Sequence, residues 1–132
     1  MSTLDLPCLS VRQPWAWLIM HGGKDIENRD WRTKFRGVIG IHAAQGMTAR
    51  EYDEAAQFSR TVDAGIRIPP PDKLVRGAIL GTVTVTDCVR DSTSPWFTGL
   101  YGLMLANAEP WREPFRAKGA LGIWRCFIEV CR

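Results

Sequence analysis

The chain has 132 residues, of which 45% are hydrophobic and 23% charged, a composition typical of one globular domain over residues 1–132 and not of a disordered chain. No segment approaches the roughly 18 consecutive apolar residues of a membrane-spanning helix, and the N-terminus lacks a secretory pattern, so we expect no membrane partner. The net charge is only +3, yet seven basic residues oppose three acidic ones between Arg12 and Arg50, which favours either an anionic partner such as nucleic acid or a solvated basic face.

The first predicted elements are a strand over residues 6–11 and a helix that follows it. Pro14 fits the first turn of a helix, because its fixed backbone angle suits that position. Apolar residues at helical spacing continue from there, and Gly22 ends the helix. They are Trp15, Leu18 and Ile19.

Residues 24–29 form a short, extended and highly charged segment. A period of two residues places Glu27 and Arg29 on one face of a strand. Lys24 joins them only if the chain bends at Gly23, and glycine makes such a bend cheap. Charges between two apolar elements are costly unless they pair or face a cleft, so this segment predicts a functional cleft.

A basic loop over residues 32–37 leads to a strand over residues 38–43. Its odd-numbered residues suit the core, and His42 lies on the opposite face, either as a structural group or as a proton acceptor. Thr48 and Glu51 then match a capping box, which predicts a helix that ends near residue 63 and lies on the surface of the sheet.

The C-terminal half predicts mainly strands. Valines and threonines alternate over residues 76–89, and Asp87 near the end of this strand is either a structural cap or an acid with a raised pKa. A short strand over residues 103–106 and a last strand over residues 120–130 follow. Two prolines and Trp111 indicate a loop between them.

These elements predict an α+β fold that is mainly β: a small, curled β-barrel of five to six strands with two or three short helices. The order of elements is not the regular alternation of a doubly wound sheet. Small barrels of this kind often bind oligonucleotides on one face. The sequence contains six tryptophans, and Trp31, Trp96 and Tyr101 lie in loop-like segments where they could stack on unpaired bases.

The four cysteines show neither a CxxC pair nor the spacing of a zinc finger. With only two histidines in the chain, we expect no metal site and no cofactor. Cysteines scattered among apolar residues are typical of a reducing compartment, so we predict a cytoplasmic location.

Several sequence blocks occur together in a distinctive order. They are Gln13-Pro14-Trp15-Ala16, Gly22-x-Lys24-x-x-Glu27-x-Arg29, Trp31, Arg36-Gly37 before Ile41-His42-Ala43, Ile79-Leu80-Gly81, Trp96-Phe97-x-Gly99 and Lys118-Gly119-Ala120-Leu121-Gly122-Ile123-Trp124. With these blocks the chain resembles the ASCH domain family of the PUA-like superfamily, and in particular its small, stand-alone members of prokaryotic or phage type.

The resemblance implies a β-barrel with a cleft beside the GxKxxExR segment, used on RNA, DNA or nucleosides. Members of the family are proposed as RNA-binding modules, and others resemble ribonucleases or amidohydrolases that act on N4-acetylcytidine. By this resemblance Lys24 is the cleft lysine, Glu27 the adjacent acid, and Arg29 a structural or phosphate-contacting residue. The amidohydrolases use a threonine at the position of Glu27, which cannot serve as a hydroxyl nucleophile, and Asp87 or Asp91 is the candidate third acid.

We therefore predict a module that binds RNA, other single-stranded nucleic acid, or a modified nucleoside or nucleotide. The candidate ligand-binding residues are Arg12, Gln13, Lys24, Glu27, Asn28, Arg29, Trp31, His42, Trp96 and Tyr101. The alternative is a hydrolase in which Lys24 and Glu27 are catalytic, with Lys24 or His42 as the proton acceptor. A third hypothesis is a protein-interaction domain whose charged segment is purely structural.

Overall fold

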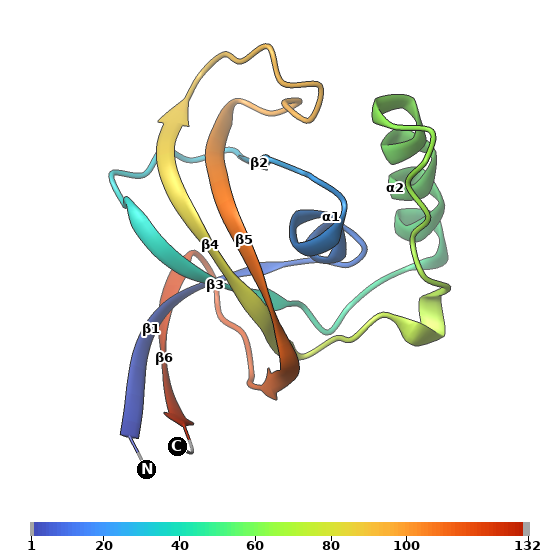
Figure 1. Cartoon of the computed structure of the whole chain (residues 1–132). Helices are drawn as coiled ribbons and strands as arrows, with labels where there is room; N and C mark the ends of the chain where they lie inside the picture. Colours follow the sequence, from blue (N-terminus) through green and yellow to red (C-terminus); the bar gives the residue numbers. More distant parts are fainter. Residues whose placement is uncertain (1, 131–132) are drawn as a thin grey trace.

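The computed structural model describes residues 2–130 (Figure 1). Its elements in chain order are β1 (Ser2–Val11), α1 (Trp15–His21), β2 (Ile26–Arg29), β3 (Gly37–Ala43), α2 (Ala49–Val62), the 3-10 turn η1 (Pro71–Lys73), β4 (Ala78–Val89), β5 (Tyr101–Arg116) and β6 (Ile123–Val130). The six strands form one sheet in the order β2-β5-β4-β3-β1-β6. The predicted class, α+β and mainly β, is confirmed.

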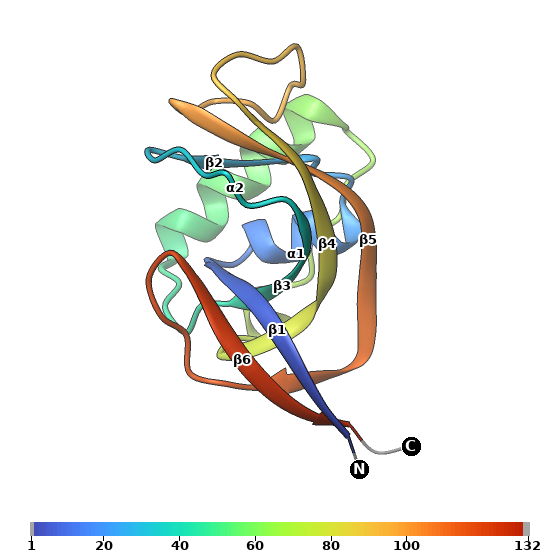
Figure 2. The ribbon, with the colours of Figure 1, turned by 90° about the vertical axis from the view of Figure 1, so that its left-hand side faces the viewer.

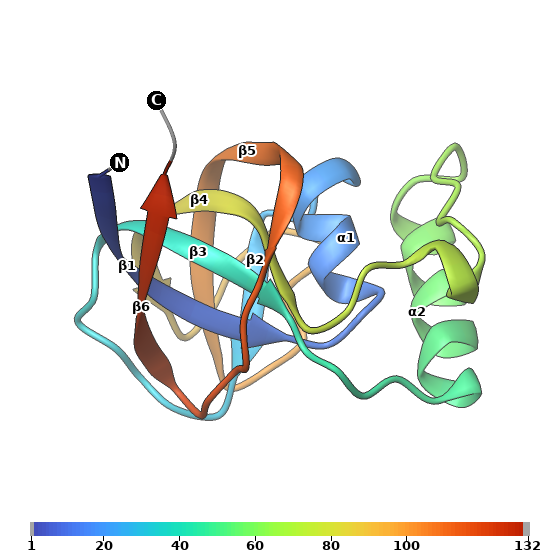
Figure 3. The same cartoon turned by 90° about the horizontal axis from the view of Figure 1, so that it is seen from below.

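The sheet is strongly curled, as Figures 2 and 3 show from two further directions. β1 and β3 run parallel, and the other four neighbouring pairs are antiparallel. Within residues 2–130 the edge strands β2 and β6 are not hydrogen-bonded to each other. The predicted barrel is therefore only partly realised, because the curled sheet stays open.

The main core fills the concave side of the sheet, against which α1 packs. Alternating residues of the strands, such as Ile39 and Ile41 on β3, are fully buried there. Ala16 and Ile19 of α1 pack into the same cluster, as the helical spacing predicts. Within residues 2–130, neither helix is long and apolar enough to cross a membrane.

The helix α2 does not lie on the sheet, so that prediction is wrong. Its capping box is present, with Thr48 Oγ1 accepting from the Glu51 backbone N–H, but its apolar side faces α1 and the segment before β5 (Figure 1). Phe58 lies 5.9 Å from both Trp15 and Trp96, measured between ring centroids. The aromatic rings, and not the strands, thus give α2 its apolar partner.

The strand β5 is far longer than predicted, because it continues through the expected loop around Trp111 to Arg116. β2 covers only its first four residues, and beyond them β5 is an edge strand on which proline removes no hydrogen bond of the sheet. Register shifts against β4 accommodate the irregular stretch. Gly81 makes the close approach feasible, since a side chain there would collide with the backbone of Glu109.

Candidate functional site

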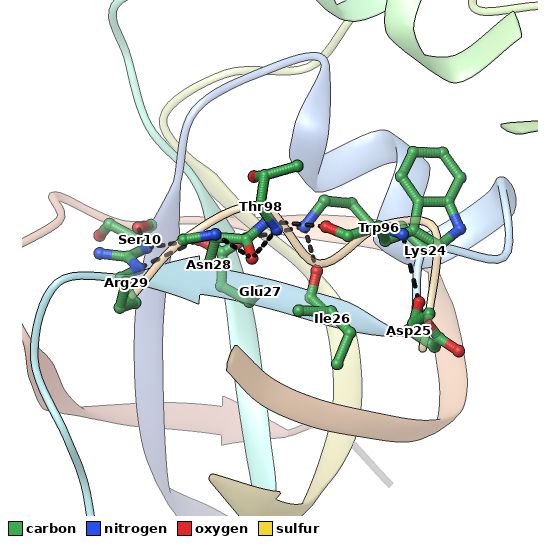
Figure 4. Close-up of polar contacts among 11 residues, drawn as sticks. Ser10, Lys24, Asp25, Ile26, Glu27, Asn28, Arg29, Trp96 and Thr98 are labelled. Atoms are coloured by element: carbon green, nitrogen blue, oxygen red, sulfur yellow. Dashed lines mark hydrogen bonds and ion pairs between the residues drawn. The ribbon is translucent and has the colours of Figure 1, made fainter. Parts of the chain in front are cut away.

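The charged segment turns at Gly23 and then enters β2. Gly23 has a φ of +75°, a backbone conformation that glycine adopts without strain. The bend turns Lys24 back over β2, where its Nζ donates to the carbonyl oxygen of Ile26 and lies 3.2 Å from Glu27 Oε1 (Figure 4). The structure thus brings Lys24 and Glu27 together in the way that the glycine suggested.

Glu27 lies between two cations. Its second carboxylate oxygen, Oε2, accepts from Arg29 Nε at 3.0 Å, while Oε1 contacts Lys24. Arg29 Nη2 also donates to the backbone oxygen of Ser10 at 2.7 Å, which links β2 to the end of β1 (Figure 4). The side chains of Lys24 and Glu27 are 3% and 9% exposed, and that of Arg29 is 22% exposed, so the network extends from the interior to solvent.

The network is satisfied without a ligand. No buried side-chain nitrogen or oxygen in the described residues lacks a hydrogen-bond partner. Lys24 Nζ also lies 5.8 Å from the centroid of the Trp15 ring, on which a cation is favourable. Buried charges are tolerated when they are paired and hydrogen-bonded in this way, and removing one partner of such a set is strongly destabilising.

This network borders a cavity of about 850 Å³, which we call the first cavity. Its volume lies within the range of about 300–1,000 Å³ that is usual for small-molecule sites. Three aromatic residues from separate segments contribute to its walls: Trp15 from α1, Phe58 from α2 and Trp96 from the segment before β5. The cavity therefore combines flat apolar surfaces with a charged wall.

Asn28 fixes the segment that carries Trp96. Its side-chain Nδ2 donates to the Trp96 carbonyl oxygen at 2.9 Å, and its Oδ1 accepts from the backbone N–H groups of Thr98 and Gly99 (Figure 4). Trp96 is only 4% exposed, so it is a buried wall and not the exposed stacking surface that the sequence indicated. Asn28 lines the cavity, yet its amide is committed to positioning the opposite wall.

Six of the predicted ligand-binding residues line the first cavity: Arg12, Lys24, Glu27, Asn28, Arg29 and Trp96. Four lie elsewhere. Gln13 is buried and bridges the Val75 oxygen and the Trp17 N–H, since a side-chain amide in a core must satisfy both of its ends. Trp31 packs against the main core, Tyr101 begins β5, and His42 borders a second cavity.

The two candidates for a third acid are also outside the first cavity. Asp87 is exposed and pairs with Arg36 at 3.1 Å, because a register shift in β4 turns it away from the core. Asp91 accepts from the backbone N–H of Ser92 in the loop that follows. The acids that do line the cavity besides Glu27 are Asp30 and Glu54.

The local basic excess is largely neutralised in the folded chain. Ion pairs to carboxylates engage five of the seven basic residues between positions 12 and 50. They are Arg12 with Glu51, Lys24 and Arg29 with Glu27, Arg36 with Asp87, and Arg50 with Glu54. The segment therefore does not form the single basic face that its composition suggested.

The sequence did not indicate several residues of the cavity. Trp15 matched a core stripe, and Phe58 was expected to face the sheet, so neither was recognised as a wall. Ser10 carries no sequence signal at all, because its contribution comes from the end of β1 meeting β2. Only tertiary structure brings these residues to one place.

Comparison with known proteins gives one family. The sequence model of the ASCH domain matches residues 9–119. Activating signal cointegrator 1 from Homo sapiens is 34% identical over 82 residues, which are 62% of this chain and 14% of that protein. The protein of the same name from Mus musculus is 33% identical over 82 residues, with the same coverage. The chain therefore matches only a small part of the length of these relatives.

Proposed function

The chain belongs to the ASCH domain family, and we propose that residues 1–132 form one such domain, which binds single-stranded nucleic acid by taking an unpaired base into the first cavity. Among ligand classes we favour RNA, and a modified nucleoside or nucleotide could place its base in the same cavity. The prokaryotic or phage type of the protein and its cytoplasmic location stay predictions.

The observation that carries this proposal is the pairing of aromatic walls with a polar network in one cavity. Nucleobases are flat and apolar on their faces, and stacking on an aromatic side chain stabilises binding by about 1–3 kcal/mol per base. Trp15, Phe58 and Trp96 bring aromatic rings to the walls from three separate segments. The edge of a base carries donors and acceptors, which the charged wall can match.

The network retains hydrogen-bonding capacity for a ligand. An ammonium group has three protons, and within the described residues Lys24 uses two of them, on Ile26 and Glu27. Each carboxylate oxygen of Glu27 can accept a second hydrogen bond, such as one from the amino group of cytosine. Arg12, about half exposed, stands among the lining residues as a further donor.

The test is a binding assay with a fluorescent eight-nucleotide RNA, followed by anisotropy for the wild type and Lys24→Met. Methionine keeps much of the length of lysine but removes the donors, so we expect affinity to fall about tenfold. Lys73→Ala, an exposed lysine outside the first cavity, is the matched control and should bind as the wild type does. Thermal unfolding of each variant, measured first, tells whether Lys24→Met still folds, because the loss of a buried cation beside Glu27 is destabilising. Equal binding by a folded Lys24→Met would contradict the proposal.

Hydrolysis is the second candidate function. The contact of 3.2 Å between Lys24 and Glu27 favours it, since a carboxylate beside a lysine in a cavity can exchange a proton with it. The same proteins are therefore incubated with N4-acetylcytidine and with RNA while products are followed. Product formed by the wild type and not by folded Lys24→Met would make this chain an enzyme.

A further inference from the structure

A second cavity, of about 920 Å³, lies between β3 and the segment that joins β5 to β6. Arg116 and Lys118 line it. None of its eleven lining residues, all from the described part of the chain, is acidic. In Figure 2 the β5–β6 segment rises beside the end of β1. The cavity thus has positive side chains and no carboxylate to neutralise them.

A partly buried hydrogen-bond network fixes the wall of this second cavity. His42 Nε2 lies 2.7 Å from the carbonyl oxygen of Ala117, which only accepts, so this nitrogen carries the proton. In the neutral imidazole Nδ1 accepts from Ser10 Oγ at 3.0 Å, and Trp124 Nε1 donates to the same Oγ at 3.1 Å. The position of the wall is therefore set by groups from β1, β3 and β6.

Gly119 completes this wall because it has no side chain. A Cβ atom at this position would lie 2.6 Å from both His42 Cε1 and Ser10 Oγ. The backbone next to Lys118 thereby lies directly against the network. Glycine at this position therefore lets the segment that carries Lys118 pack against His42 and Ser10.

Ser10 connects the two cavities, since it lines both of them. Its backbone oxygen accepts from Arg29 on the side of the first cavity, and its hydroxyl group contacts His42 on the side of the second. Because Gly119 lies against Ser10, the neighbouring Lys118 is close to the residue that both cavities share. Leu121, which is 98% exposed, lies among the lining residues of the second cavity and offers apolar surface to a further base.

The charged residues that line the two cavities differ, and this difference indicates which part of a ligand each cavity suits. The first cavity has three basic and three acidic lining residues, which suits an uncharged base. The second has only basic ones, which suits a phosphate group. We infer that the second cavity is a phosphate-binding subsite for the backbone of the strand whose base occupies the first. This inference rests on the proposed function, and it makes the ligand an oligonucleotide and not a free nucleoside.

The test compares cytidine with an eight-nucleotide oligocytidylate, using wild type, Lys118→Ala and the control Lys73→Ala. Lys118→Ala should weaken oligonucleotide binding about fivefold at low salt while cytidine binding changes less than twofold. One lost phosphate contact should reduce the slope of log K against log salt concentration by about 0.7. An oligonucleotide affinity and salt slope equal to those of Lys73→Ala would overturn the inference.

A second variant tests the wall without changing charge. Gly119→Ala should displace the segment that carries Lys118 and weaken oligonucleotide binding in the same selective way, in a protein that still unfolds cooperatively. If Lys24→Met weakens oligonucleotide binding but neither Lys118→Ala nor Gly119→Ala does, the proposed function stands and the subsite is wrong. If the wild type binds neither probe, the proposed function and the subsite both fail.

Discussion

The two cavities share Ser10 but balance their charges in opposite ways. In the first, Glu27 holds the buried Lys24 and the partly exposed Arg29, and aromatic rings complete the walls. In the second, arginine and lysine face a cavity without acidic lining, and much of the wall is small residues and backbone. Under the proposed subsite, the residues that contact phosphate lie outside the segment in which basic residues are most in excess.

From this comparison we expect that removing a charged group lowers the free energy of unfolding strongly in the first cavity and only slightly in the second. Glu27→Gln leaves Lys24 and Arg29 without their carboxylate, so we expect the free energy of unfolding to fall by about 3–5 kcal/mol. Lys118→Ala removes an exposed side chain and should change it by less than about 0.5 kcal/mol. Urea denaturation measures both values. Similar losses for the two variants would mean that the first cavity does not depend on its ion pairs.

A second prediction concerns the wall that Asn28 holds. Asn28→Ala removes three hydrogen bonds to the segment before β5, and we expect a loss of about 2 kcal/mol together with weaker RNA binding. Asn28→Asp keeps the acceptor for Thr98 and Gly99 and should lose less. Denaturation and anisotropy on the same samples test this order. Undiminished binding by Asn28→Ala would show that the first cavity does not need a fixed Trp96 wall.

The smallest expected effect is a pH dependence of the unfolding free energy. It arises at Glu51, which pairs with Arg12, a lining residue of the first cavity. Hydrogen bonds from the Arg12 guanidinium, then from the Thr48 backbone, hold the pKa of Glu51 near 2, from an ordinary 4.5. A lowered pKa stabilises the fold above about pH 4.5, and this contribution disappears as the pH falls towards 2. Glu51→Gln should therefore cost about 1 kcal/mol at pH 7 and almost nothing at pH 2.

The control for this prediction lies in the second cavity. The difference in unfolding free energy between wild type and Lys118→Ala should stay the same between pH 4 and pH 2, because no carboxylate lines that cavity. Above pH 4 the comparison would also include His42, which lines the same cavity. The measurement is urea denaturation at pH 7, 4 and 2. If the difference in unfolding free energy between wild type and Glu51→Gln does not shrink in acid, the contact between Arg12 and Glu51 does not stabilise the fold.

Local sequence rules predicted those features that local physics decides. The capping box at Thr48, the glycine bend before Lys24 and the alternation of β3 all have short-range causes. The length of β5 was missed, because its prolines are harmless only on an edge that β2 leaves uncovered. The order of strands in a sheet cannot be inferred from the sequence of one strand.

The candidate site was predicted where its residues are contiguous and missed where they are not. Lys24, Glu27 and Arg29 lie within six positions, so one strand and one bend bring them together. Phe58 reaches the same cavity only because α2 packs on aromatic rings and not on the sheet. Asp87 lies outside the first cavity, because a register shift between strands decides which way its side chain points.

The β1–β6 pair has a mechanical consequence. Ser2 is paired with Val130, and the described ends of the chain lie side by side, away from α2 (Figure 1). A force that pulls these two ends apart would load the hydrogen bonds of this antiparallel pair one after another, starting at Ser2, and not all at once. In an optical-trap experiment the sheet would therefore open by unzipping at its β6 edge, while β2, at the opposite edge of the sheet, would be among the last strands to feel the load.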